Sequence, residues 1–227
     1  MDFFLKENNN FTPFTLQHAI VALFCICFGF ALIVITKKQT NKVQSIIGNV
    51  FAFSICFTVL LGTFVHLYKG NFNIQEDLPL HLCSFLALII PVLSVTKKFV
   101  YYEIFFFLIL AGTLQSLITP DEHNYLNFPF FRYWFVHAGL VVFMFFATFI
   151  YKMRPTLRSV GKSFLGMQAY MLFMFILNYF LGSNYFYTNR KPDAATALDL
   201  FGDWPQYIFV VEILVIPYFM LIYLPFY

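Results

Sequence analysis

The sequence predicts an all-α polytopic membrane protein, a bundle of about seven transmembrane helices, and three observations lead to this fold class. Of the 227 residues, 60% are hydrophobic, 22% aromatic and only 11% charged, whereas a soluble domain has about 25% charged residues. The 34 Phe and 14 Tyr residues are too many for one soluble core of this size. Apolar runs of about 20 residues, the length that crosses the hydrocarbon layer as a helix, recur along the chain. Together these features exclude a water-soluble globular domain.

Seven apolar runs are the candidate spans of a single transmembrane domain, 1–227. They lie at about 17–36, 45–68, 80–95, 99–118, 130–151, 161–182 and 205–225. The third is the weakest because it is short and contains Pro91, and Pro217 predicts a kink in the seventh. Most connections are short, but the outer loop 183–204 is polar and long enough to fold back over the mouth of the bundle. Its ALDLF segment is expected to form a short interfacial helix.

The distribution of charge predicts the orientation of the spans. The alternate loops 37–44, 96–98 and 152–162 contain nine basic and no acidic residues, whereas nearly every acidic residue lies on the other side. By the positive-inside rule, the N-terminus is outside and the C-terminus cytoplasmic. The expected location is a bacterial inner or plasma membrane, which the chain crosses several times. The net charge of +3, without a Lys/Arg run, excludes a nucleic-acid partner.

Polar residues within the spans gather near their outer ends. Because burying such groups in a membrane is costly, they are candidates for function. Glu212 must either be protonated or have a partner, for which Arg132 or a histidine is the expected choice. The layer predicts a polar cavity open to the outer leaflet, although capping and interhelical hydrogen bonds are an alternative role for each member. Its members are His81, Cys83, Gln115, Ser116, Thr119, Arg132, His137, Asn178 and Glu212, and His18 and His66 also lie near the outer ends of their spans.

Cys83 is the strongest candidate nucleophile. The other three cysteines lie inside apolar runs, where a cysteine usually acts as a small hydrophobic residue. A thiolate needs a nearby base, which an imidazole supplies. His81 is a poor partner because residues two apart point to different faces of a helix, whereas His137 lies at a similar depth on another span. The alternative is that Cys83 only packs and His137 only anchors a helix.

Several sequence signatures are absent, which narrows the chemistry. The chain has no GxSxG elbow, HExxH helix, P-loop or GxGxxG turn. No Cys/His spacing is typical of a zinc site. We therefore expect neither a metal nor a cofactor.

Four segments carry a resemblance to a known family: LPLHLCSF (78–85), AGTLQSLITPD (111–121), RYWFVHAGL (132–140) and NYFLGSNYFYTNRKPDAATALDLFGDWP (178–205). From about residue 45 onward the chain resembles the bacterial YwaF-type membrane proteins, relatives of the eukaryotic transmembrane protein 164 family. That resemblance implies a lipid acyltransferase using a Cys and a His, distantly similar to the androgen-induced-gene lipid hydrolases, which use Thr and His.

The resemblance also implies residue roles. His137 matches the family histidine. The family cysteine lies next to a His, whereas here Leu82 separates His81 from Cys83, and aligning the histidines puts Leu80 at the nucleophile position. The two alignments assign different residues to the family nucleophile.

The leading hypothesis is a membrane-embedded acyltransferase or acyl hydrolase acting on phospholipid or lysophospholipid near the outer leaflet. Cys83 would be the nucleophile and His137 the general base, with Gln115, Ser116 or Asn178 donating hydrogen bonds to the oxyanion. His81, Arg132 and Glu212 would contact substrate or support the pair. The alternative is a transporter or binding protein with the same residues around an outward-facing cavity, and a third possibility is a scaffold. A transporter usually shows inverted repeats and a site at the midplane, and we find neither pattern in the sequence.

Overall fold

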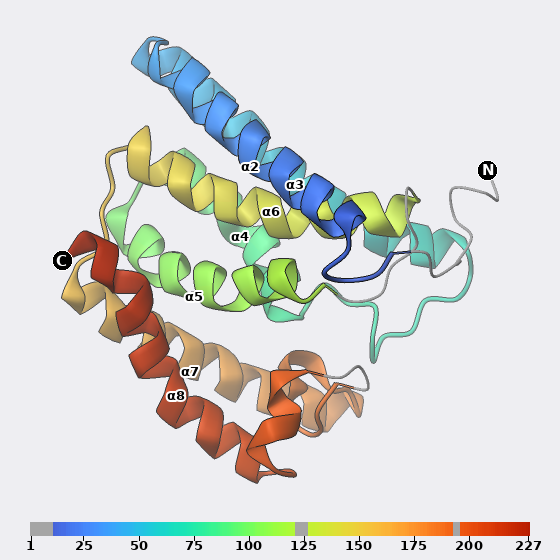
Figure 1. Ribbon diagram of the computed structural model, residues 1–227. Helices are drawn as coiled ribbons and strands as arrows, with labels where there is room; N and C mark the ends of the chain where they lie inside the picture. Colours follow the sequence, from blue (N-terminus) through green and yellow to red (C-terminus); the bar gives the residue numbers. More distant parts are fainter. Residues whose placement is uncertain (1–10, 121–126, 193–195) are drawn as a thin grey trace.

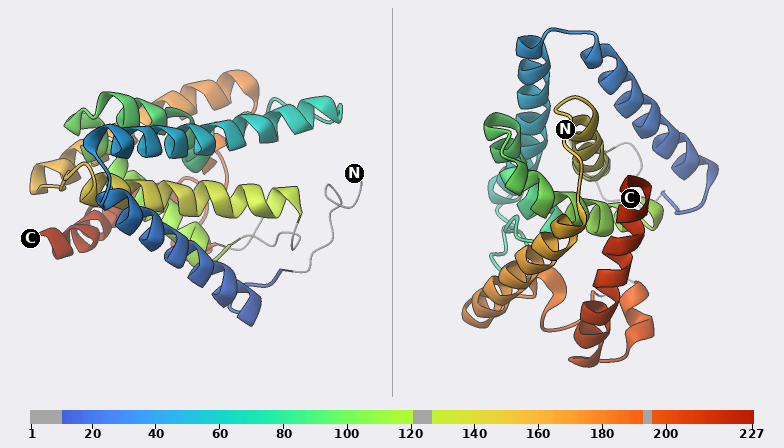
Figure 2. Two further views of the ribbon diagram at one scale, coloured as in Figure 1. Left: turned by 90° about the horizontal axis from the view of Figure 1, so that it is seen from above. Right: turned by 90° about the vertical axis from the view of Figure 1, so that its left-hand side faces the viewer.

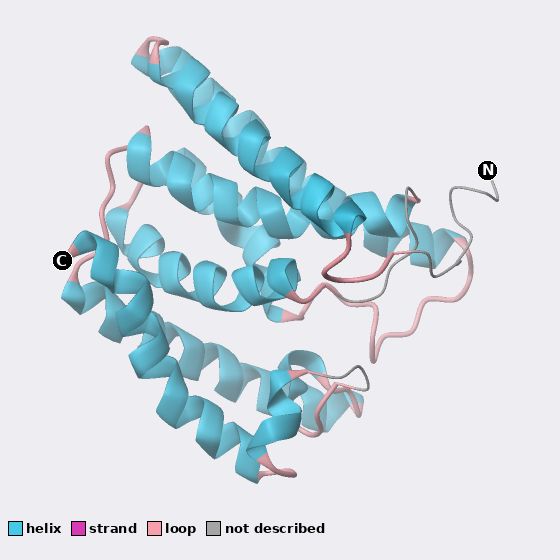
Figure 3. Cartoon of the chain, viewed as in Figure 1, coloured by secondary structure: helices cyan, strands magenta, loops and turns pink. Residues whose placement is uncertain are grey.

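The computed structural model describes residues 11–120, 127–192 and 196–227, and within these ranges the chain is helical without strands (Figure 3). Figure 1 labels the seven α-helices of the described chain. They are α2 (Leu16–Lys37), α3 (Asn41–Tyr68), α4 (Leu82–Thr96), α5 (Phe99–Ile118), α6 (Phe128–Phe149), α7 (Leu157–Leu181) and α8 (Gln206–Tyr223), with 3₁₀ turns η1 (Tyr185–Tyr187), η2 (Ala197–Phe201) and η3 (Leu224–Phe226). The all-α fold class is confirmed.

Six of these helices are long and apolar enough to cross a membrane, so the chain is a multi-pass membrane protein. The exception is α4, which has 15 residues and therefore extends only about 22 Å at 1.5 Å per residue. This helix is the run predicted to be the weakest, and Pro91 lies buried inside it. It begins at Leu82 rather than Leu80, with His81 as its N-cap.

Local side chains determine where several helices begin and end. Thr15, Thr40 and Asn127 are extended N-cap residues whose side chains accept hydrogen bonds from the first-turn amides of α2, α3 and α6, as N-caps do. Gly182 ends α7 in the left-handed region, with a φ of 64°, which only glycine adopts without strain. The boundaries follow from residues that the chain carries at those positions.

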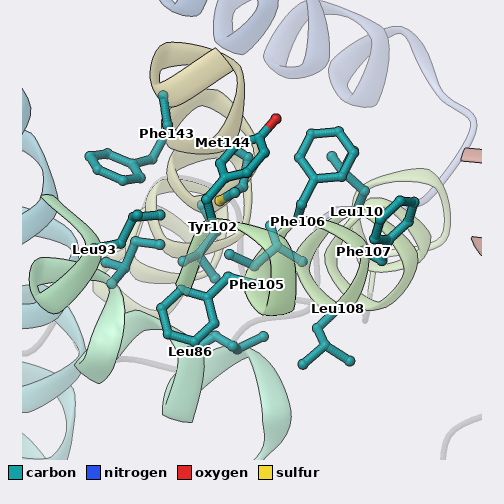
Figure 4. Packing of buried hydrophobic residues seen from close by; sticks show 14 of the residues in the cluster. Leu86, Leu93, Tyr102, Phe105, Phe106, Phe107, Leu108, Leu110, Phe143 and Met144 are labelled. Atoms are coloured by element: carbon teal, nitrogen blue, oxygen red, sulfur yellow. The ribbon is translucent and has the colours of Figure 1, made fainter. Parts of the chain in front are cut away.

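Helix α5 lies at the centre of the bundle and contacts α4, α6, α7 and α8 (Figure 1). Figure 4 shows its aromatic side chains interleaved with Leu86 and Leu93 of α4 and with Phe143 and Met144 of α6. In contrast, α2 diverges from α3 (Figure 2, right) and leaves most of its apolar side chains exposed. Such exposure is compatible with a lipid environment, where apolar surface has no hydration penalty.

The outer loop packs against the segment that precedes α4. The Tyr185 hydroxyl donates to the carbonyl oxygen of Ile74 (2.8 Å) and accepts from the Leu78 amide (2.9 Å). Burial raises the pKa of Tyr185, so the phenol remains a donor. The ALDLF segment forms η2, as the sequence predicts, and a capping box of Thr196 and Asp199 begins it. Residues 193–195 of the predicted loop lie outside the described ranges.

Candidate functional site

Two hydrogen bonds define the register between the antiparallel neighbours α5 and α6. The hydroxyls of Tyr102 and Thr148 are 2.8 Å apart, and the Tyr133 hydroxyl donates to the carbonyl oxygen of Ser116 at 2.6 Å. The second hydrogen bond lies later in the sequence of α5 and earlier in the sequence of α6 than the first, as expected for antiparallel helices. The helices therefore stay in register from their inner ends to their outer ends.

This register brings Thr113 of α5 to the level of His137 of α6. Thr113 follows Tyr102 by 11 residues, and His137 precedes Thr148 by the same number. Because 11 residues are close to three helical turns, each residue also shares the face of its helix that carries the paired hydroxyl. We infer that Thr113 and His137 face each other across the α5–α6 contact.

Cys83 joins this position from a third helix. It is the second residue of α4, and its Sγ lies 3.6 Å from the Oγ1 of Thr113, a side chain with 0% exposure. The hydroxyl therefore links the thiol of α4 to the level of the imidazole on α6. Sequence reasoning missed Thr113, although a lone hydroxyl within the apolar run before Gln115 was a usable sign. We call Cys83, Thr113 and His137 the three-helix cluster.

The ring of His137 is oriented by Tyr133, one turn earlier on α6. Its Nδ1 lies 2.7 Å from the carbonyl oxygen of Tyr133, and the two ring centroids are 4.2 Å apart. A carbonyl oxygen can only accept a hydrogen bond, so Nδ1 carries the hydrogen and the Nε2 of the neutral ring holds a lone pair. This tautomer is the one that a general base needs.

His81 has different neighbours from Cys83. Its ring lies 5.3 Å from that of Tyr185 and 5.0 Å from that of Tyr187, both in the outer loop. It lines a polar cavity of about 190 Å³ beneath this loop. The structure thus places the ring of His81, the extended N-cap residue before α4, beside two tyrosines of the outer loop.

Gln115 and Ser116 form their hydrogen bonds within α5. The exposed Gln115 amide donates to the Thr119 hydroxyl at 2.9 Å, and the Ser116 hydroxyl donates to the Gly112 carbonyl oxygen at 3.4 Å. The contribution of Ser116 to the site comes instead through its backbone, which accepts the bond from Tyr133. An oxyanion role for either side chain has no support in these contacts.

Asn178 anchors the outer loop, which differs from the oxyanion role that the sequence suggested. Its Nδ2 donates to the Tyr185 carbonyl oxygen (2.8 Å) and to the Thr188 hydroxyl (2.7 Å). Its Oδ1 accepts from the Ser183 hydroxyl (2.6 Å) and the Tyr185 amide (2.9 Å). Both amide hydrogens are therefore occupied, and the side chain, 1% exposed, has no donor left for a substrate.

Glu212 and Arg132 do not pair with each other, so that prediction is corrected. Glu212 of α8 accepts a hydrogen bond from the Gln168 amide of α7. Arg132 lies against Gly62 of α3, where an added Cβ would be 2.5 Å from its Nη1, and its charge interacts with Asp77. The hydrogen-bond partner of Glu212 is a neutral amide on an adjacent helix. The sequence prediction considered only basic partners and therefore missed it.

No three His, Cys, Asp or Glu side chains of the described chain lie close enough together to hold a metal ion.

Comparisons with known proteins identify the family. No curated protein and no solved structure matches the chain. A family model described as the TMEM164 family matches residues 13–223, from before α2 to the end of α8. The matched range contains the entire three-helix cluster and the outer loop. The chain belongs to the TMEM164 family.

Proposed function

We propose that this protein is a lipid acyltransferase or acyl hydrolase that acts on phospholipid or lysophospholipid near the outer leaflet. The observation that carries the proposal is the α5–α6 register, which sets His137 level with the Thr113 hydroxyl that contacts Cys83. A thiol, a hydroxyl and an imidazole at one level are the groups that covalent acyl transfer uses. The resemblance of the sequence motifs to the transmembrane protein 164 family implies the same reaction class.

The first half-reaction would form a thioester. Cys83 Sγ attacks the ester carbonyl carbon of a phospholipid while its proton passes to the Nε2 of His137. The tetrahedral intermediate collapses, the ester C–O bond breaks, and the departing lysophospholipid oxygen takes the proton from the imidazolium. The acyl group then remains on sulfur and the imidazole is neutral again.

The second half-reaction would release the acyl group. A lipid hydroxyl, a lipid amine or water loses a proton to His137 and attacks the thioester carbonyl. The C–S bond breaks, the sulfur recovers the proton, and the acceptor leaves with the acyl group. A lipid acceptor makes the reaction a transfer, and water makes it a hydrolysis.

Thr113 and Tyr133 would act as positioning residues. Thr113 holds the thiol through its hydroxyl, and Tyr133 holds the imidazole through its carbonyl oxygen and ring. Both are buried or half-buried and belong to helices rather than loops. Such rigid support keeps reacting groups within the narrow geometric limits that catalysis requires.

The transporter or binding-protein alternative has less support from the contacts of the polar layer. That reading needs the predicted residues around one cavity. Instead, Asn178 is occupied by the outer loop, Glu212 by Gln168, and Arg132 lies against α3. A polar layer divided among separate structural contacts favours a small catalytic cluster over one broad substrate cavity.

Mass spectrometry of the intact protein and of its proteolytic peptides, after incubation in phospholipid nanodiscs, tests the proposal. We expect a hydroxylamine-sensitive acyl adduct on the peptide that contains Cys83, absent from Cys83→Ala and present in the matched control Cys56→Ala. Turnover of a phospholipid with a radiolabelled acyl chain should be lost in the same variant. Full turnover by a folded Cys83→Ala protein would overturn the proposed nucleophile. If Thr113→Val then lost all activity, the hydroxyl would be the nucleophile instead.

A further inference from the structure

Two cavities of opposite character adjoin each other beneath the outer loop. The polar one, of about 190 Å³, is lined by Gln75, Glu76, His81, Gly182, Ser183, Asn184, Tyr187, Arg190, Lys191 and Pro192. The apolar one, of about 160 Å³, lies between α7, α8 and the loop. Tyr187 lines both cavities. An elongated ligand with one polar and one apolar end would match this arrangement.

Arg190 supplies the available positive charge of the polar cavity. Its backbone is held by Asn184, but its guanidinium makes no hydrogen bond or ion pair with the rest of the described chain. Lys191, the other cation of this lining, already faces Asp203 at 3.3 Å and Asp199 at 3.7 Å. A guanidinium is well suited to phosphate oxygens, which it can bind in a bidentate manner.

The apolar cavity is formed mainly by flexible and aromatic side chains of α7, α8 and the outer loop. Met167 and Met171 come from α7, Val211 from α8, and Phe186 and Leu198 from the loop. Unbranched methionines adapt to chains of varying shape. Phe186 and Cys83 both pack against the main hydrophobic core cluster of the bundle.

Tyr187 is held in place at a backbone cost. Phe186 and Tyr187 have φ values of 60° and 53°, a region that non-glycine residues rarely enter and that is often associated with functional sites. The Tyr207 hydroxyl donates to the Tyr187 carbonyl oxygen, and the Tyr187 ring lies 5.0 Å from that of His81. The loop thus maintains an unfavourable conformation at the residue that lines both cavities.

We propose that the two cavities form one binding site for a phospholipid. The phosphate of its headgroup lies beside Arg190 in the polar cavity, and the first part of one acyl chain lies in the apolar cavity beyond Tyr187. The apolar half favours a lipid over free phosphate as the ligand. Binding at this site does not require the Cys83 thiol or the His137 imidazole. The further claim that the site presents substrate to Cys83 rests on the proposed function.

Photo-crosslinking of the full chain in nanodiscs tests this site. The probe is a lysophosphatidylcholine with a diazirine near the carboxyl end of its acyl chain, applied in the Cys83→Ala background so that turnover does not consume it. We expect adducts on the 186–212 segment. Arg190→Gln should weaken labelling about tenfold through loss of a charged hydrogen bond, and Val211→Trp should remove it by filling the apolar cavity. Arg158→Gln and Ile213→Trp are matched controls at exposed positions elsewhere and should label normally.

Competition experiments distinguish phospholipid from detergent and from free phosphate as the ligand of this site. Unlabelled phospholipid should displace the probe, whereas dodecyl maltoside and inorganic phosphate should not. Equal competition by dodecyl maltoside would contradict recognition of the phospholipid headgroup. Competition by inorganic phosphate alone would contradict the assignment of a lipid as the ligand. Labelling unaffected by both Arg190→Gln and Val211→Trp would refute the site. Failure of the proposed function has a different outcome, because the probe would still label 186–212 while the wild-type protein showed no acyl turnover.

Discussion

The Nδ1 of His137 lies 2.7 Å from the backbone carbonyl oxygen of Tyr133, one turn earlier on the same helix. This bond assigns the hydrogen of the neutral ring to Nδ1 and leaves Nε2 as the basic atom. The side chain of Tyr133 is held in turn by Ser116 of α5. A histidine with a fixed tautomer and a fixed ring orientation has the features of a general base.

Cys83→Ala and His137→Ala should each reduce acyl turnover by several orders of magnitude. The double variant should be no slower than either single one, because both groups serve one step. The measurement is release of a radiolabelled acyl chain, normalised to folded protein. Cys56→Ala is the control and should lose only about 1–3 kcal/mol of stability through packing. Additive losses would contradict a shared step.

Tyr133→Phe should be mild. The change keeps the backbone carbonyl and the ring beside His137 but removes the hydroxyl bond to Ser116. We expect a loss of about 0.5–1.5 kcal/mol in the free energy of unfolding and a turnover close to wild type, measured by denaturation in detergent and by the acyl-release assay. Complete inactivation of a stable Tyr133→Phe protein would instead give the hydroxyl a chemical role.

Asn178→Ala should release the outer loop. The change leaves the buried amide and carbonyl of Tyr185 without their side-chain partners, and each unsatisfied group costs about 1–3 kcal/mol. Limited proteolysis should cut the 183–205 segment faster than in wild type. The matched control is Tyr179→Ala on the same turn, whose side chain is 83% exposed. Unchanged protection in Asn178→Ala would show that Tyr185 alone holds the loop.

Lys162→Met should destabilise the inner half of the bundle. Glu103 of α5 is buried and paired with Lys162 of α7, and it also accepts from the Ser159 hydroxyl at 3.0 Å. Removing Lys162 leaves the buried Glu103 carboxylate without its cation, but the Lys162 side chain is 46% exposed and solvent screens part of the pairing. We therefore expect a loss of about 1–3 kcal/mol in the free energy of unfolding, less than for a fully buried pair. Thermal unfolding should therefore occur at a lower temperature, and Glu103→Gln in the same chain should restore part of the loss. The exposed Lys152→Met change is the control.

The orientation is tested by single-cysteine labelling with a membrane-impermeant maleimide in a cysteine-free background. Cysteines at Gln39 and Arg158, in the basic loops, should react only after the membrane is opened. Cysteines at Asn71 and Asn189 should react in intact cells. The reason is the positive-inside rule applied to nine uncompensated basic residues. Reaction of residue 39 or 158 in intact cells would reverse the orientation.

The sequence by itself determined the helical architecture. Each predicted span agrees with a helix of the structure to within four residues at either end, because a bilayer restricts spanning segments to long apolar helices with internal hydrogen bonds. The short α4 and the η2 turn were also evident, from Pro91 and from the ALDLF segment. These properties depend on neighbours in the sequence.

Only the tertiary structure decided which polar groups meet. The partners of Asn178, Glu212 and Cys83 lie on other helices or loops, at Tyr185, Gln168 and Thr113. From charge and depth, the sequence predicted a basic partner for Glu212. In the structure, the packing of α7 against α8 brings the amide of Gln168 to it instead. A polar side chain can be placed at a depth from its sequence position alone, but its partner depends on the rotation and register of packed helices. Those quantities are set by contacts between residues far apart in the chain.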